Sequence, residues 1–203
     1  DFRSMGIFIL LSSQSSNHQT CSGEFLIMAF IRKHASNERI EEQKAVIDFL
    51  NSNEVIYEKW DINKLPEELR EKFNLTDEEK QRILSAFGIE IADISERRNY
   101  QQADVISLSE ATPNLEQLLK NFQQEHHHED DEVRFIVSGH GIFVIQSEDG
   151  EFFDVELQPG DLISVPENVR HYFTLMEDRK VVAVRIFVTT EGWVPIYEKE
   201  TVV

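Results

Sequence analysis

Cysteine is almost absent from the sequence, which has one, Cys21, among 203 residues. No intramolecular disulfide can therefore form, and a reducing compartment, the cytoplasm, is expected. Basic residues are also scarce, because 20 lysines and arginines face 38 aspartates and glutamates, for a formal net charge of −18. This balance argues against nucleic acid or an anionic membrane surface as a partner. No apolar run approaches the roughly 20 residues needed to cross a bilayer, so we expect no membrane span.

The remaining composition fits one globular domain, because 203 residues that are 40% hydrophobic can bury one sizeable core. Residues 1–27 do not match the rest, since polar residues dominate them after an apolar run, 7–11, that is too short for a secretory signal. We expect 1–27 to be a non-native or disordered leader without a functional role. A single domain is expected over 28–203, with a helical part at 28–124 and a barrel core at 125–203.

Helical patterns dominate the first half of that domain. Apolar residues at helical spacing predict a helix over 37–50, and Pro66, followed by two glutamates, favours a second helix start. A capping box from Thr76 to Glu79 predicts a third helix, and a fourth opens at Thr112-Pro113 and runs through Phe122. Short strands are predicted between these helices, over 54–62 and 105–108.

The hydrophobic period changes to two beyond Glu125. Six strands are predicted there, separated by turn residues such as Glu148-Asp149-Gly150 and Gln158-Pro159-Gly160: 133–137, 142–146, 152–156, 161–165, 171–175 and 181–188. Many short antiparallel strands with regular turns are typical of a jelly-roll barrel, whose mouth can hold a small ligand. The predicted fold is therefore mainly β, with a helical N-terminal portion that covers a C-terminal barrel.

Three adjacent histidines lie at the start of this β region. Side chains alternate between the two faces of an extended strand, so His126 and His128 point the same way and His127 the other. Glu132 keeps the parity of His126 and His128, although a bend over 129–131 would break the register. Two imidazoles and a carboxylate that converge on one point suit a borderline divalent ion such as iron, nickel, manganese or zinc.

A fourth donor would come from elsewhere in the chain, and His171 offers it. The histidine run could instead be a purification tag, which would lie at a terminus, or part of an acidic surface loop that happens to contain histidine. The run is internal, which argues against a tag, and the downstream pattern argues against a chance surface loop. A strand-like run at 134–137, Gly139, Gly141 and a second run at 142–145 place the histidines on a β-hairpin, as in a metal motif.

Two groups of residues resemble the two-part motif of the cupin superfamily: His126-x-His128-x-x-x-Glu132 with Gly139, and Pro159-Gly160-Asp161 with Pro166 and His171. Four shorter segments are similar, more closely, to the acireductone dioxygenase family of the methionine salvage pathway: Val133-Arg134-Phe135, Asp161-Leu162-Ile163-Ser164-Val165-Pro166, Arg185-Ile186-Phe187 and Glu191-Gly192-Trp193. The likeness runs from about Met28 to the C-terminus, which is most of the chain.

This resemblance implies a metal centre in which His126, His128, Glu132 and His171 hold one Fe²⁺ or Ni²⁺ per monomer. An octahedral ion with these four ligands keeps two positions open for a bidentate substrate. A structural zinc is usually closed by four protein ligands, often with cysteine among them. No cysteine lies near this site in the sequence, so iron or nickel is favoured over zinc. We expect the protein to act as a monomer.

The resemblance also bears on two arginines and three aromatic residues. An arginine within an apolar strand, such as Arg185, is costly to bury unpaired, and a structural ion pair is the alternative role for it. The matching arginines of the family line the metal pocket, so Arg134 is expected to orient and stabilise the enediolate, with Arg185 in support. Aromatic residues are more often plain core than pocket, but the expected pocket walls are Phe122, Phe173 and Trp193.

The implied reaction is the cleavage of acireductone, 1,2-dihydroxy-3-keto-5-methylthiopentene, by dioxygen. In this family an iron site gives formate and 4-methylthio-2-oxobutanoate, and a nickel site gives formate, carbon monoxide and 3-methylthiopropanoate. Two alternatives stay open. One is another cupin metalloenzyme, an isomerase or small-molecule dioxygenase, for which the arginines and Trp193 fit less well. The other is a non-catalytic ligand-binding cupin, a type that commonly lacks a complete set of four ligands.

Overall fold

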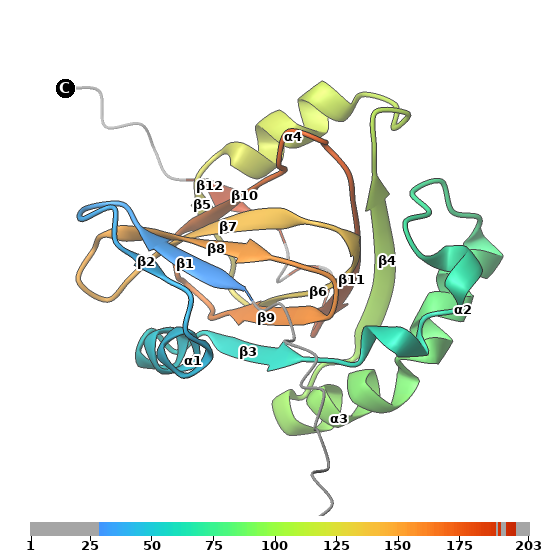
Figure 1. The fold of residues 1–203 in the computed structure, drawn as a ribbon, viewed down its shortest axis with the longest axis horizontal. Helices are drawn as coiled ribbons and strands as arrows, with labels where there is room; N and C mark the ends of the chain where they lie inside the picture. The colour runs from blue at the N-terminus through green and yellow to red at the C-terminus, as the bar shows by residue number, and fades with distance from the viewer. Residues whose placement is uncertain (1–28, 190, 192–193, 198–203) are drawn as a thin grey trace, which may run out of the picture.

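The computed structural model describes residues 29–189, 191 and 194–197. Within this part the strands form two antiparallel sheets that face each other as a barrel (Figure 1). The larger has seven strands, in the order β12 (Ile196–Tyr197), β5 (His126–His127), β10 (His171–Thr174), β7 (Gly141–Gln146), β8 (Phe152–Leu157), β1 (Phe30–Lys33) and β2 (Arg39–Ile40). The smaller has five, in the order β3 (Ile56–Lys59), β9 (Asp161–Val165), β6 (Glu132–Gly139), β11 (Val181–Phe187) and β4 (Gln102–Leu108).

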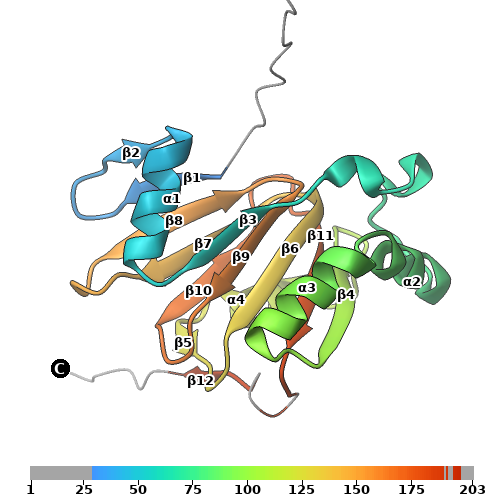
Figure 2. The ribbon, with the colours of Figure 1, turned by 90° about the horizontal axis from the view of Figure 1, so that it is seen from below.

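The helices lie outside the sheets (Figure 2). They are α1 (Gln43–Ser52), α2 (Asp77–Ala86), α3 (Gly88–Arg98) and α4 (Leu115–Gln123), with two short 3₁₀ turns, η1 (Ile62–Lys64) and η2 (Glu67–Leu69). Helices α2 and α3 cover the outer face of the five-stranded sheet. None of the helices in the described ranges is long and apolar enough to cross a membrane.

Strand periodicity divides the five-stranded sheet between two cores. In β6, Phe135 and Val137 belong to the outer core, where they pack with Phe87 and Ile94 of the helical layer. Ile136, between them, belongs to the inner core that both sheets share. Neighbouring side chains on a strand face opposite sides of the sheet, so the even-numbered positions of β6 from Glu132 to Ile136, before the register shift in its pairing with β11, point into the barrel. This parity aims Glu132 and Arg134 at the barrel interior.

The predicted class, mainly β with helices in the N-terminal portion, is confirmed by the two antiparallel sheets. All six strands predicted beyond Glu125 are present, within one or two residues at their ends, as β6 to β11. The capping box is also confirmed, because the Thr76 hydroxyl accepts from the backbone N–H of Glu79 and the Glu79 carboxylate accepts from that of Thr76. The expected leader, 1–27, lies outside the described residues.

The first half of the chain differs from its predicted elements in three places. Residues 37–50 are not one helix, because Arg39 and Ile40 form β2 and the helix begins at Gln43. Glu42 explains that start, since its carboxylate caps the backbone N–H groups of Lys44 and Ala45. Pro66 opens only the 3₁₀ turn η2. Strand β1 was not predicted and joins β2 in the larger sheet, whereas β3 and β4 of the smaller sheet correspond to the strands predicted over 54–62 and 105–108.

Candidate metal centre

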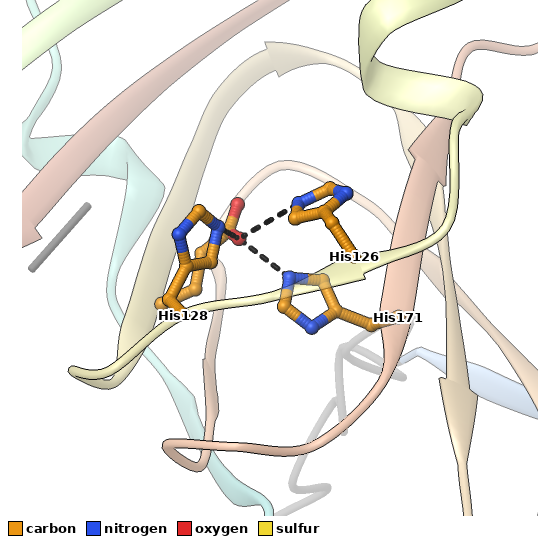
Figure 3. A group of neighbouring side chains, drawn as sticks. His126, His128 and His171 are labelled. Carbon is orange, nitrogen blue, oxygen red and sulfur yellow. Dashed lines mark hydrogen bonds and ion pairs between the residues drawn. The ribbon is translucent and has the colours of Figure 1, made fainter. Parts of the chain in front are cut away.

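Four side chains from three segments meet at one end of the barrel (Figure 3). His126 lies on β5, His128 follows in the loop after it, and Glu132 begins β6. His171 begins β10, which pairs with β5 so that His171 lies opposite His126. All four are buried, with at most 7% of each residue exposed. The structure therefore brings the three histidines and the carboxylate together as the sequence predicts.

The carboxylate of Glu132 is at the centre of the group. Its Oε2 lies 2.6 Å from Nε2 of His171 and 2.8 Å from Nε2 of His128. Nε2 of His126 lies 3.9 Å from the same oxygen. One donor atom from each of the four residues can be chosen so that all lie within 4.8 Å of one another, which is a suitable spacing for the ligands of a single ion.

Backbone carbonyls fix the tautomers of two of the histidines. Nδ1 of His126 lies 2.6 Å from the carbonyl oxygen of Gln124, and Nδ1 of His171 lies 2.8 Å from that of Val169. A carbonyl oxygen only accepts, so each Nδ1 donates, and a neutral ring then has its lone pair on Nε2. Both lone pairs face the carboxylate. Histidines that ligate a metal through one ring nitrogen usually donate the N–H of the other in this way.

The electrostatics of the site keep these groups ready to bind a cation. Burial, reinforced by the neighbouring His171 and His128, lowers the pKa of His126 to about 4, so its ring is neutral near pH 7. Burial alone would raise the pKa of Glu132, but the Arg134 guanidinium and His171 hold that pKa well below its usual range. A deprotonated carboxylate and neutral imidazoles are the forms that coordinate metal.

Three buried imidazoles and one carboxylate, without a nearby thiolate among the described residues, form a His₃Glu metal site. These donors fit a borderline divalent ion. The two acceptor lone pairs of His126 and His171 and the anion of Glu132 also need a positive charge between them, because their mutual repulsion is otherwise uncompensated. The observed arrangement therefore fits a bound metal.

The bend after His128 is present, yet the two ends of the motif still converge. Residues 128–131 are not strand, and Asp131 anchors them to the rest of the fold. Its carboxylate accepts from the Arg98 guanidinium and from the Tyr100 hydroxyl, both at 2.7 Å. The backbone N–H of Asn168 donates to the carbonyl of His128 at 2.8 Å. Sequence reasoning missed Asp131, because its partners lie in α3 and the turn after it, a helix that the sequence pattern did not reveal.

A cavity of about 260 Å³ lies beside the four side chains. Its apolar wall comes from four strands and one helix, and includes Ile106, Leu108, Phe122, Ile136, Phe173, Val181 and Ala183. Phe122 and Phe173 are thus in the pocket wall as predicted from the sequence, whereas Trp193 lies outside the described residues. Pro195 and Tyr197 also line the cavity. Sequence reasoning missed these two, because only the pairing of β12 with β5 carries them to the site.

Both predicted arginines line this cavity. Nη2 of Arg134 lies 2.8 Å from Oε1 of Glu132, the oxygen that does not face His171 and His128. Arg185 lies opposite Arg134 on the neighbouring strand. It forms a two-point ion pair with Asp104, with Nε 2.6 Å from Oδ1 and Nη2 2.5 Å from Oδ2. The structural ion pair considered for Arg185 is therefore present, and it coexists with a place in the cavity wall.

Comparison with known proteins gives consistent results. The model of the ARD/ARD' family matches residues 30–195. An acireductone dioxygenase of Bacillus velezensis is 71% identical over 176 residues, which cover 86% of this chain and 99% of that protein. One of Bacillus subtilis is 70% identical over the same shares. A solved acireductone dioxygenase from Bacillus anthracis, with a cadmium ion in its active centre, superimposes with a TM-score of 0.83 at 67% identity, over 84% of this chain and 99% of that one.

Proposed function

The chain belongs to the ARD/ARD' family, and on that basis we propose that it cleaves acireductone with dioxygen as a metal-dependent dioxygenase of methionine salvage. The observation that carries the proposal is the buried His₃Glu group, which opens onto a cavity that also contains Arg134. A metal centre beside a buried cation suits an anionic, oxygen-rich substrate of small size.

We propose His126, His128, Glu132 and His171 as the ligands of one Fe²⁺ or Ni²⁺ per monomer. When bound, such an ion supplies Lewis acidity and a template for two substrate oxygens. The chain supplies the rest. Its backbone carbonyls hold the Nδ1 protons of His126 and His171, so both rings keep the orientation that coordination needs without reorganisation during turnover.

Arg134 is proposed to orient and stabilise the enediolate form of the substrate. Its side chain is 15% exposed and pairs with Oε1 of Glu132, so its guanidinium is held within reach of an anion at the centre. A fixed positive charge in a cavity with little water stabilises developing negative charge more strongly than the same charge in solution. Arg185 is proposed to support it from the next strand.

The apolar wall is proposed to exclude water from the reacting oxygens. Phe173 packs at 5.0 Å between ring centroids against Phe143 of the inner core, so its position in the wall is fixed. Phe122 approaches from α4. We propose Trp193 as a third aromatic wall residue.

One experiment tests the function. Metal-free protein is loaded with Fe²⁺ or with Ni²⁺, given acireductone under controlled dioxygen, and followed by oxygen uptake and product analysis. We expect formate and 4-methylthio-2-oxobutanoate from the iron form, and formate, carbon monoxide and 3-methylthiopropanoate from the nickel form. The ligands are the same in both, so the metal supplied selects the products. Absence of oxygen uptake with either metal would refute the proposal.

Three further parts of the proposal concern the whole chain. The protein acts as a monomer in the cytoplasm, and residues 1–27 take no part in function. Light scattering after size exclusion tests the monomeric state, and cell fractionation tests the cytoplasmic location. A chain that starts at Met28 tests the third, because its turnover should equal that of the full chain.

A further inference from the structure

Three charged residues lie in one row across the five-stranded sheet. Arg185 on β11 lies opposite Asp104 on β4 and, on its other side, opposite Arg134 on β6. Directly opposite residues of antiparallel strands carry their side chains on the same face, close enough to interact. The row therefore places two guanidinium groups side by side, with one carboxylate at its outer end.

Each arginine of the row has its own carboxylate. Arg134 pairs with Glu132, which belongs to the metal site, whereas Arg185 pairs with Asp104 through two parallel contacts of 2.6 and 2.5 Å. A two-point pair fixes the plane of a guanidinium as well as its position, which a single contact does not. The Arg185 side chain is 30% exposed, so it borders solvent into which it could turn, and the two-point pair restricts that motion.

Asp104 also reduces the repulsion within the row. Burial lowers the pKa of Arg134, the charge of Arg185 acts in the same direction, and the charges of Glu132 and Asp104 oppose it. Two cations on adjacent strands of the same face repel each other. A carboxylate beyond Arg185 draws its guanidinium towards the sheet edge and limits this repulsion.

The residues that line the cavity include Arg185 but, in the described part of the chain, not Asp104. Asp104 therefore does not touch a cavity ligand, and its two-point pair with Arg185 is its direct contact with the cavity wall. We propose that Asp104 is a positioning residue that holds the guanidinium of Arg185 at the cavity wall for the dianionic substrate. This inference rests on the proposed function, because that function defines the substrate.

The central experiment compares Asp104→Asn with wild type in the metal-loaded full chain. The amide keeps the shape of the side chain but cannot form the charged two-point pair. We expect KM for acireductone to rise about tenfold while kcat changes less than about twofold, the pattern of lost binding that is shared by ground state and transition state. Asp104→Glu, which restores a carboxylate, should recover most of the wild-type KM.

A matched control is Asp93→Asn. Asp93 also pairs with an arginine, Arg97, but on the exposed surface of α3, so this variant loses the same charge far from the cavity. Its KM should stay at the wild-type value. A double-mutant cycle adds the test of mechanism: in an Arg185→Gln background, Asp104→Asn should have no further effect on KM. An equal rise in KM in that background would show that Asp104 does not act through Arg185.

A second readout does not depend on turnover. Calorimetry under argon measures the binding of oxalate, a small planar dianion, to the metal-loaded protein, with the metal content checked afterwards. Asp104→Asn should weaken oxalate binding by about the same factor as KM. A variant with unchanged or tighter binding, or with a lowered melting temperature as its only change, would overturn the inference. Failure of wild type to turn over acireductone would refute the proposed function instead, and the oxalate comparison would still decide the role of Asp104.

Discussion

Oε2 of Glu132 lies 2.6 Å from Nε2 of His171, although 39 positions separate the two residues in the chain. Nδ1 of His171 donates to the carbonyl of Val169, so in a neutral ring Nε2 has only a lone pair to present to the carboxylate. Two acceptors at this distance are stable only with a proton or a metal ion between them. The contact therefore requires a cation between the two atoms, either a proton or a metal ion.

Replacing His128 by alanine should remove the metal. Nε2 of His128 lies 2.8 Å from the shared carboxylate oxygen, so the variant loses one of four donors, and we expect metal content and oxygen uptake to fall at least about tenfold. The fold should persist, because the side chain lies at the open end of the barrel beside the cavity. Elemental analysis and circular dichroism measure the two outcomes. His127→Ala is the matched control, since His127 is outside the group of four donors. Normal turnover by His128→Ala would refute its assignment as a ligand.

Replacing Arg134 by alanine should separate metal binding from activity. Arg134 contacts Oε1 of Glu132 and leaves Oε2 to the histidines, so the metal should be retained. We expect kcat to fall roughly 100-fold, the usual loss for one preorganised charge-stabilising donor. Metal analysis and steady-state kinetics test both statements on the same sample. Arg134→Lys, which keeps the charge but not the planar fork, should fall between alanine and wild type. A wild-type rate in the alanine variant would limit Arg134 to a structural role.

The stability of the metal-free protein should fall as the pH drops from about 6.5 to about 4. The folded-state pKa of His126 is lowered from 6.5 to about 4 by burial. Above pH 6.5 the ring is neutral in both the folded and the unfolded state, and between the two pKa values only the unfolded chain takes up the proton. The free energy of unfolding should therefore decrease across this window, by about 3 kcal/mol in total. Urea unfolding at a series of pH values measures the slope. His126→Gln should reduce that slope, and an unchanged slope would contradict the assignment.

Replacing Gly141 by alanine should disturb the cavity through Phe173. A methyl group at this position would lie 2.3 Å from Cζ of Phe173, so the ring must move. We expect a loss of about 1–3 kcal/mol in the free energy of unfolding, as for other overpacked sites, and a raised KM because Phe173 lines the cavity. Gly88→Ala is the control, since a methyl group there has nothing within 4 Å and the residue is helical. That variant should be at least as stable as wild type.

Much of the site could be predicted from the sequence because local rules govern it. Strand parity alone aligned His126 with His128, and the two are buried together. Parity could not by itself predict that Glu132 converges with them, because the alternation of side chains is lost across a bend. The structure shows that the bend is held by Asp131 through Arg98 and Tyr100, contacts between segments that no local pattern connects.

Long-range pairing explains what the sequence could not reveal. Asp104 is one polar residue in a short strand, and only the register of β4 with β11 places it against Arg185. Tyr197 reaches the cavity through a two-residue strand, too short for periodicity to mark. Helix α3 was not predicted because Gly88 follows the periodic run of α2. A glycine after such a run usually marks the end of a helix, whereas here α3 begins at that residue.

The pairing of β12 with β5 has a consequence for the order of events during synthesis. Tyr197 lies opposite His126, so the metal pocket is walled only after residue 197 has left the ribosome. A ribosome that adds about 5–20 residues per second needs roughly several seconds to travel from the histidine run to that point. An ion bound during this interval would meet a site without the Tyr197 wall, so capture in the complete pocket follows the synthesis of β12.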